Sequence, residues 1–280
     1  MTLQQTLAEA ATRISRRDAE TLLAHVLHQP RAWLLAHPEA EIDVSHATSF
    51  SALTARRAAG EPLQYLIGIQ EFFGLELHVT PAVLIPRPET EHLVEAVLAW
   101  SHLQIKPLRI ADIGTGSGAI AVALAAHVPS AEIIATDISA DALAIARDNA
   151  LRLGFSDRIH FVQGHLLADT NSPAAPYDAI VSNPPYIPSG DATTLQREVV
   201  EHEPHTALFA GPTGLNIYRD LIPAAHQALR LGGLLAMEIG FGQREALTTL
   251  LTSHNRPAWI NIKFIDDYAD IPRVVLAERA

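Results

Sequence analysis

The tetrapeptide Asn183-Pro184-Pro185-Tyr186 brings together groups that could hold a planar NH₂ group. It follows the apolar run Tyr177–Ser182, which predicts a buried strand. Each proline fixes its own φ and keeps the preceding residue out of the helical region, so the loop should be extended and stiff. Because proline has no N–H, the loop offers carbonyl oxygens, one carboxamide and one aromatic ring, which suit the hydrogens and the flat face of an amine. A rigid proline turn with asparagine as turn former is the structural alternative.

A glycine loop lies upstream of this tetrapeptide. The predicted strand Leu108–Ile113 leads into Gly114-Thr115-Gly116-Ser117-Gly118 and then into an alanine-rich helix. Glycines let the backbone approach a ligand closely, and the helix N-terminus supplies free N–H groups. Asp137 ends the next predicted strand, about 20 residues further on, where a carboxylate can accept two hydrogen bonds from a ribose diol. Asp137 could instead cap the following helix, a role for which Ser139 competes.

The glycine loop by itself does not choose between NAD and S-adenosylmethionine. Gly114-x-Gly116-x-x-Ala119 also satisfies the dinucleotide fingerprint, which accepts alanine in the third place. A tight turn without a ligand is a third interpretation, and Asp137 at the right distance argues against it. Asp112 favours S-adenosylmethionine, because an acidic residue beside the glycines suits a cationic amino acid moiety better than a pyrophosphate.

These residues need an α/β scaffold, and the rest of the sequence predicts one. From residue 108 onward, strand-like runs alternate with helices, which indicates a mostly parallel sheet with at least one added strand. A loop is expected at Ala168–Pro176. The strand-like runs are Leu108–Ile113, Glu132–Thr136, Ile159–Gln163, Tyr177–Ser182, Gly233–Ile239, Trp259–Phe264 and Arg273–Glu278.

The first part of the chain has a different character. Residues 1–70 predict short helices that are interrupted at Pro30, Pro38 and Gly60. The alternation in Phe73–Thr80 predicts a short strand or hairpin, and the proline-punctuated segment Leu84–Thr90 leads into a helix at about 89–100. We therefore expect a helical substrate-docking domain at 1–70, a β-hairpin linker at 71–86 and a catalytic domain at 87–280.

Composition excludes several classes of function. The net charge of −11 and the pI of about 5.6 argue against broad binding to a phosphate backbone. Without cysteine there are no disulfides, no thiolate catalysis and no Cys-ligated zinc. Pro204 separates His202 from His205, and we expect no metal site. The N-terminus lacks the pattern of a leader, and no apolar run approaches the ~20 residues of a membrane span, which predicts a soluble cytoplasmic protein.

The glycine loop with Asp112, then Asp137, then Asn183-Pro-Pro-Tyr186 resemble, in that order, class I S-adenosylmethionine-dependent methyltransferases that modify planar NH₂ groups. The chain is more specifically similar to the PrmC/HemK family of release factor glutamine methyltransferases. The resemblance covers nearly the whole chain and is weakest in residues 1–55. Its further motifs are Glu61–Gly68, Glu71–Gly74, Leu84–Thr90, Asn183–Pro188, Glu203–Leu208 and Gly211–Leu215.

This resemblance implies a fold and a reaction. The fold is a small N-terminal helical domain joined by a β-hairpin to a Rossmann-like, seven-stranded methyltransferase domain. The reaction transfers a methyl group from S-adenosylmethionine to the amide nitrogen N5 of the glutamine in the Gly-Gly-Gln motif of class 1 peptide chain release factors, and S-adenosylhomocysteine is the product. We expect no direct nucleic acid partner, no membrane partner and a monomer.

The resemblance also assigns residues. Asn183, Pro184 and Tyr186 are the expected catalytic residues, and Pro185 joins them in substrate binding. The expected cofactor contacts are Asp112, Gly114, Thr115, Gly116, Ser117, Gly118, Asp137, Leu166 and Asn183. The family usually has an acidic residue near the adenine pocket, where this chain has His165, so backbone groups or His165 are expected to hold the adenine amine.

We expect orientation rather than base catalysis. The Asn183 side-chain oxygen and the Pro184 main-chain oxygen would each accept one hydrogen of the substrate NH₂, and Tyr186 would pack against the flat amide. Positioning of this kind can supply about 7–11 kcal/mol of a barrier. Arg87 and Glu89 could pair to support the linker.

Three other functions are alternatives to this interpretation, and features of the sequence argue against each of them. An adenine-N6 nucleic acid methyltransferase uses a similar tetrapeptide on a flipped base, but the acidic pI and scarce lysine oppose it. A non-catalytic module on a decayed methyltransferase fold would not keep an intact glycine loop with Asp137 and Asn183. An NAD oxidoreductase would leave the tetrapeptide unexplained.

Overall fold

The computed structural model describes residues 1–104, 106–167, 176–253 and 258–280. The expected loop at Ala168–Pro176 lies outside the described residues except for its last one. The chain divides into two compact units, which are treated separately below. The helical unit comprises Met1–Ile69 and Gln196–His202, and the sheet unit comprises Gln70–Leu195 and Glu203–Ala280. No helix in the described part of the chain combines the length and the apolar character that crossing a membrane requires.

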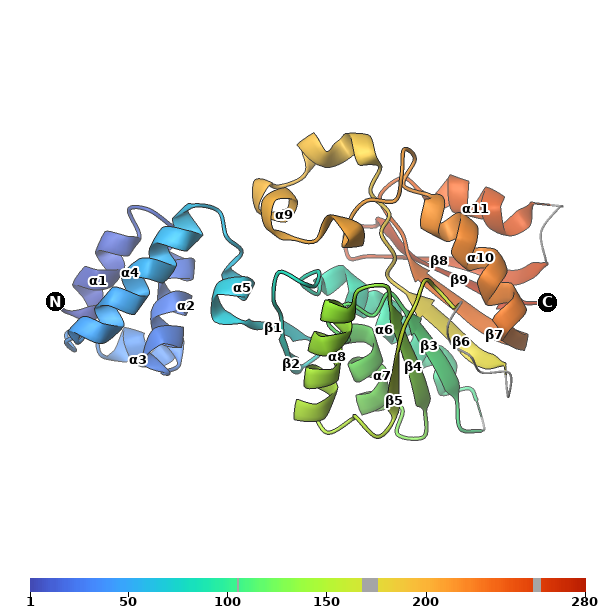
Figure 1. Cartoon of the computed structure of the whole chain (residues 1–280), viewed down its shortest axis with the longest axis horizontal. Coiled ribbons are helices and arrows are strands. Elements are labelled where there is room, and N and C mark those ends of the chain that lie inside the picture. Colours follow the sequence, from blue (N-terminus) through green and yellow to red (C-terminus); the bar gives the residue numbers. More distant parts are fainter. Residues whose placement is uncertain (105, 168–175, 254–257) are drawn as a thin grey trace. The chain divides into compact units, whose positions relative to one another are not determined.

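The helical unit is a set of short amphipathic helices (Figure 1). Polar caps start three of them, because Thr2, Ser15 and Asp43 each accept a hydrogen bond from a backbone N–H of the first turn. Buried side chains such as Leu22, Leu23 and Phe50 form its core. Its helices are α1 (Leu3–Ala10), α2 (Arg16–Leu27), α3 (Arg31–Ala36), α4 (Val44–Ala58), α5 (Leu63–Ile67) and α9 (Arg197–His202).

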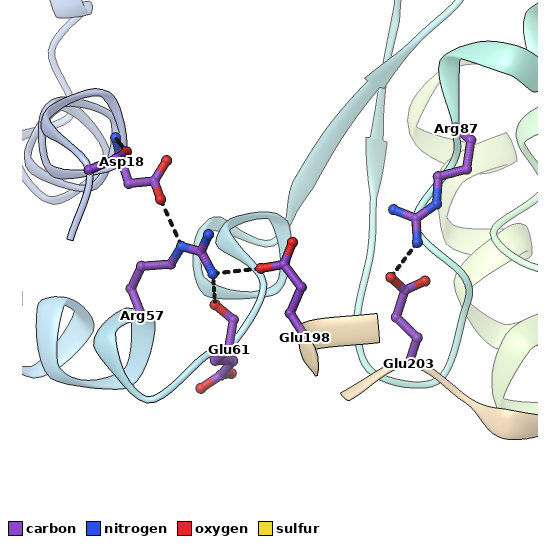
Figure 2. Close-up of polar contacts among 7 residues, drawn as sticks. Asp18, Arg57, Glu61, Arg87, Glu198 and Glu203 are labelled. Carbon is purple, nitrogen blue, oxygen red and sulfur yellow. Dashed lines mark hydrogen bonds and ion pairs between the residues drawn. The ribbon is translucent and has the colours of Figure 1, made fainter. Parts of the chain in front are cut away.

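Arg57 connects α9 to the rest of the helical unit. Its Nε donates to Asp18 at 2.8 Å, and its Nη1 donates to Glu198 at 2.7 Å and to the main-chain oxygen of Glu61 at 3.1 Å (Figure 2). From the sequence, α9 was expected in the catalytic domain, whereas the structure groups Gln196–His202 with the N-terminal helices. The segment that follows the Asn-Pro-Pro-Tyr loop therefore contributes to both units.

A seven-stranded sheet forms the centre of the sheet unit, as the sequence predicted (Figure 1). The strand order is β5-β4-β3-β6-β7-β9-β8, and β9 runs antiparallel to the other six strands. The strands are β3 (Arg109–Ile113), β4 (Glu132–Asp137), β5 (Ile159–Gln163), β6 (Tyr177–Ser182), β7 (Leu229–Glu238), β8 (Trp259–Asp266) and β9 (Pro272–Arg279). All seven strand-like runs of the sequence are strands.

Helices cover both faces of this sheet. Ile110 and Ala111 of β3 belong to different buried clusters, because successive strand residues point to opposite faces. The cluster around Ile110 packs α6 (Glu91–Ser101), α7 (Ala119–His127) and α8 (Ala140–Arg152) on one face. The cluster around Ala111 packs α10 (Asn216–Ala228) and α11 (Arg244–Thr252) on the other.

The chain order of the strands creates a crevice. From β3 the chain proceeds to β4 and β5 on one side, and it then crosses to β6 on the other side of β3. In such sheets ligands bind at the carboxyl ends of the strands beside this switch point. The predicted hairpin is present, although it starts before residue 71: β1 (Ile69–Phe72) pairs with β2 (Leu75–His78), and the short helix η1 (Pro88–Thr90) precedes α6.

Candidate functional site

A cavity of about 370 Å³ opens at the carboxyl ends of β3, β4 and β6. This volume lies in the range of small-molecule sites, and most of the lining is apolar. Nine of the residues expected at the site line it, namely Gly114, Thr115, Gly116, Ser117, Asp137, Leu166, Asn183, Pro184 and Pro185. His165 and Thr90 line it as well. The cavity therefore joins the glycine loop to the proline loop.

The glycine loop is shaped so that a ligand can approach its backbone. Gly114 and Gly116 have φ of +72° and +55°, a region that favours glycine, and a Cβ at either position would meet no protein atom within 4 Å. The N–H groups of Gly114 and Thr115 both donate to the main-chain oxygen of Thr136, which fixes the turn. The open space beside the two glycines is the cradle that a nucleoside-containing cofactor would fill.

Both carboxylate oxygens of Asp137 accept backbone hydrogen bonds at the end of β4. Its Oδ2 accepts the N–H of Gly116 and its Oδ1 accepts the N–H of Ser139, both at 2.9 Å. Each oxygen keeps a second acceptor site, since a carboxylate has about four. Ser139, not Asp137, caps α8 by accepting the N–H of Ala142 at 3.1 Å. Asp137 lines the cavity and is therefore placed for a ligand.

Asp112 is placed differently from the expectation. It is fully buried beneath the loop and does not line the cavity. Its Oδ2 accepts the Thr115 hydroxyl at 2.6 Å and the N–H of Ala121 at 3.1 Å, so it ties the loop to the start of α7. Burial raises the pKa of Asp112 to about 7. Its Oδ1 is buried without a hydrogen-bond partner among the described residues, and the expected contact with the amino acid part of the cofactor stays a prediction.

Gly118 and Tyr186 also lie outside the cavity lining. Gly118 has a φ of +82°, and a Cβ there would come within 3.1 Å of the Ala146 Cβ, so this glycine allows close packing of α7 against α8. The Tyr186 ring is half-buried, and its hydroxyl donates to Glu238 at 3.3 Å. The Tyr186 hydroxyl thus links the loop to the end of β7, and its expected stacking against the substrate amide stays a prediction.

Asn183 begins the loop directly after β6, and its side chain has a fixed partner. Its Nδ2 donates to the Thr90 hydroxyl at 3.0 Å. The neighbouring Ser182 hydroxyl donates to the main-chain oxygen of Ile113 at 2.7 Å, which joins the ends of β6 and β3. Because the Nδ2 end of the amide is held by Thr90, the Oδ1 end remains for a ligand in the cavity.

The residues behind this loop were not predicted from the sequence. Arg87 pairs with Glu203 rather than with Glu89, and Glu203 also accepts the N–H of Ile85 at 3.3 Å (Figure 2). Glu238 ends β7 and is 2% exposed. Burial raises its pKa to about 7. A single carboxylate at the end of the apolar run Leu234–Ile239 was the available signal for this residue.

Metal chemistry has no cluster to support it among the residues that the structure describes. No group of three or more His, Asp or Glu side chains there could hold a metal ion. His205 instead packs edge-on against Phe209 at 5.4 Å between ring centroids.

Comparisons with known proteins find relatives along the whole chain. The sequence matches the PrmC N-terminal domain family over residues 2–68 and the methyltransferase small domain family over residues 95–211. The release factor glutamine methyltransferase of Moorella thermoacetica is 45% identical over 289 residues, which cover 100% of this chain and 99% of the relative. That of Koribacter versatilis is 41% identical and covers 98% of this chain and 94% of the relative.

Solved structures support the fold. The catalytic domain of hMettl16, crystallised with MAT2A 3′UTR hairpin 6, aligns with a TM-score of 0.57 at 18% identity, over 85% of this chain and 86% of that chain. A methyltransferase from Pyrococcus furiosus aligns with a TM-score of 0.53 at 17% identity, over 81% and 98%. The sheet unit thus has the class I methyltransferase fold. With relatives at 40% identity or more along its whole length, the chain belongs to the family of release factor glutamine methyltransferases.

Proposed function

We propose that this protein transfers a methyl group from S-adenosylmethionine to the amide nitrogen N5 of the glutamine in the Gly-Gly-Gln motif of class 1 peptide chain release factors. The methyl–sulfur bond breaks and a carbon–nitrogen bond forms, so the other products are S-adenosylhomocysteine and one proton, which leaves the amide nitrogen for solvent. The observation that carries the proposal is the Asn183 carboxamide, which is held at its Nδ2 end by Thr90 and lines the same cavity as the glycine loop.

The cofactor fits the donors and acceptors on the cavity wall. Asp137 would accept the ribose hydroxyls, and the open backbone of Gly114 and Gly116 would lie against the nucleoside. His165 and Leu166 lie on the wall after β5, where the adenine would be held. When bound, S-adenosylmethionine supplies an electrophilic methyl group on a sulfonium, which is a good leaving group.

The protein's own task is to aim a poor nucleophile. The lone pair of an amide nitrogen is delocalised into its carbonyl, and a neutral asparagine cannot act as a base. The Asn183 Oδ1 and the Pro184 main-chain oxygen would each accept one N–H of the substrate, which fixes the plane of the amide. Orientation of this kind contributes on the order of 7–11 kcal/mol.

The proposal includes a protein partner and no nucleic acid partner. The net charge of −11 disfavours a phosphate backbone. We infer that the enzyme acts as a monomer in the cytoplasm, where release factors function in translation.

Mass spectrometry of a class 1 release factor after incubation with the enzyme and S-adenosylmethionine tests this function. We expect a gain of one methyl group on the Gly-Gly-Gln glutamine and none after that glutamine is replaced. Asn183→Ala should abolish transfer while calorimetry still detects cofactor binding. Labelled cofactor offered with nucleic acid is the competing arm, and methyl transfer to nucleic acid instead of the release factor would overturn the assignment.

A further inference from the structure

A chain of hydrogen bonds connects Asn183 to a buried carboxylate. Asn183 Nδ2 donates to Thr90 Oγ1 at 3.0 Å, and Thr90 Oγ1 donates to Glu238 Oε2 at 2.6 Å. The other carboxylate oxygen, Oε1, accepts the Tyr186 hydroxyl at 3.3 Å. Sheet register explains this proximity, because Ser182 of β6 pairs with Met237 of β7, so Asn183 and Glu238 leave neighbouring strands at the same edge. Thr90 and Glu238 are 4% and 2% exposed.

The buried carboxylate of Glu238 determines the donor-to-acceptor direction of these hydrogen bonds. An ionised carboxylate only accepts hydrogen bonds, and a threonine hydroxyl has a single proton to donate. Once the Thr90 proton points to Glu238, the Thr90 oxygen can only accept from Asn183. Only the Nδ2 end of the asparagine amide can donate, so Oδ1 must face the cavity.

We propose that Glu238 and Thr90 are positioning residues that set which end of the Asn183 carboxamide faces the substrate. This inference rests on the proposed function, because it assumes that Asn183 accepts an N–H from the substrate amide. With the carboxamide turned over, its own NH₂ would oppose the NH₂ of the glutamine, and two donors repel each other. The selection of one orientation is therefore a condition for transfer.

The same inference implies that the segment Leu84–Thr90 positions the Thr90 hydroxyl. Arg87 pairs with Glu203 (Figure 2). Glu203 also accepts the N–H of Ile85, so the segment is held at two points. Pro88 starts η1, and Thr90 is its last residue. Proline pre-sets φ for the first helical position. The stiff segment thereby delivers the Thr90 hydroxyl to the point between Asn183 and Glu238.

Protonation of Glu238 should disturb this arrangement. Its carboxylate accepts hydrogen bonds from Thr90 and Tyr186. Burial raises its pKa to about 7, while the charge of Glu89 in η1 raises the pKa and that of Arg273 in β9 lowers it. A protonated Glu238 can donate a hydrogen bond to the Thr90 oxygen. The Thr90 hydroxyl can then rotate and donate to Asn183, which favours the orientation in which Asn183 Oδ1 faces Thr90 instead of the cavity. We therefore expect kcat to fall as the pH decreases through about 7.

The decisive comparison is between Thr90→Val and Thr90→Ser. Valine has the shape of threonine without the hydroxyl, so the Asn183 NH₂ loses its partner, and kcat should fall about 10- to 100-fold. Serine keeps the hydroxyl and should recover most of that loss. Thr54→Val is the matched control, because Thr54 in α4 is equally buried and its hydroxyl has no hydrogen-bond partner in the described part of the chain.

Measurements besides kcat separate positioning from folding. For Thr90→Val we expect unchanged cofactor affinity by calorimetry, an unchanged KM for the release factor and a Tm close to that of Thr90→Ser. The inference is overturned if Thr90→Val keeps kcat within twofold, if serine loses as much as valine, or if cofactor affinity and KM fall together with kcat. Failure of the wild-type enzyme to methylate the glutamine would instead refute the proposed function.

A pH series completes the test. The wild-type kcat should rise through about pH 7, and Glu238→Gln should abolish this rise because glutamine does not titrate. A variant that retains the wild-type pH profile would show that another group is responsible and would contradict the role of Glu238.

Discussion

Replacing Glu238 by glutamine should stabilise the sheet unit at high pH. The carboxylate lies in the protein interior, where an ionised group is poorly solvated, and its pKa rises from the ordinary value of 4.5 to about 7. A group whose pKa is raised on folding favours the folded state most at low pH. That contribution is complete below about pH 4.5 and is lost as the pH rises through about 7.

The size of the effect follows from these two values. The rise in pKa from 4.5 to about 7 is equivalent to about 3 kcal/mol of unfolding free energy at high pH. Between pH 5 and pH 8.5 the wild-type protein should lose most of this contribution, about 2–3 kcal/mol. Glutamine at position 238 does not titrate, so Glu238→Gln should lack this particular loss, and the difference in unfolding free energy between the two proteins should grow with pH. Asp112, with a similarly raised pKa, is present in both and cancels.

Urea unfolding at several pH values provides the measurement. The three tryptophans are Trp33 in the helical unit and Trp100 and Trp259 in the sheet unit. A Trp33→Phe background therefore makes intrinsic fluorescence report on the sheet unit alone. Parallel stability profiles with and without the Glu238→Gln substitution between pH 5 and pH 8.5 would refute the reasoning, because they would show that Glu238 does not titrate in this range.

Three more predictions concern other parts of the molecule. Asp137→Ala should weaken S-adenosylmethionine affinity roughly 10- to 150-fold by calorimetry, because it removes hydrogen bonds to a charged acceptor worth about 1.5–3 kcal/mol, and unchanged affinity would contradict the assignment to ribose. Gly118→Ala should destabilise the protein by about 1–3 kcal/mol more than Gly154→Ala in thermal unfolding. The two glycines have nearly the same φ, +82° and +81°, but only a Cβ at Gly118 would meet Ala146. Equal losses would rule out that contact as the reason for glycine at position 118. Arg57→Met should speed amide hydrogen exchange in α9 by the equivalent of about 1–2 kcal/mol, because it breaks the ion pair with Glu198. Arg197→Met breaks an exposed ion pair with Glu201 and should leave the exchange rate unchanged. Equal exchange in the two variants would show that Arg57 does not hold α9.

The sheet could be predicted because its strands have a local signature. Parallel strands are buried on both faces, so they read as short apolar runs between polar or glycine-containing segments. Ile159–Gln163 and Tyr177–Ser182 have the predicted bounds. β7 begins at Leu229 rather than at Gly233, because the register shifts opposite Tyr177–Ala179 and the strand continues through its glycines. Glycines inside a run look like its end when only the sequence is read.

Contacts between distant segments left no such signature. Arg57 and Glu198 are separated by 141 residues, and no sequence motif that contains one of them predicts its contact with the other. The short helix α9 was therefore grouped with its neighbours in sequence and not with the helical unit. The pairing of Arg87 with Glu203 was missed for the same reason.

Two carboxylates in the cofactor region looked alike in sequence and differ in structure. Asp137 is the last residue of β4, so its side chain emerges at the sheet edge and reaches the cavity. Asp112 precedes the last residue of β3, and the glycine loop folds back over it, so that Thr115 and Ala121 use its Oδ2. A shift of one residue relative to the strand end thus separates a carboxylate that lines the cavity from one that is buried beneath the glycine loop.

Glu238 shows how a residue that lowers folding stability can still be required for function. An apolar side chain would fill the same space without the penalty of a buried charge, and such replacements are often stabilising. It could not, however, accept the Thr90 proton. Glutamine would offer one acceptor and one donor and so would allow either polarity. Only a carboxylate accepts from both Thr90 and Tyr186, which forces the Asn183 amide into a single orientation. Stability lost at neutral pH is thus the consequence of a group that aligns the loop for transfer.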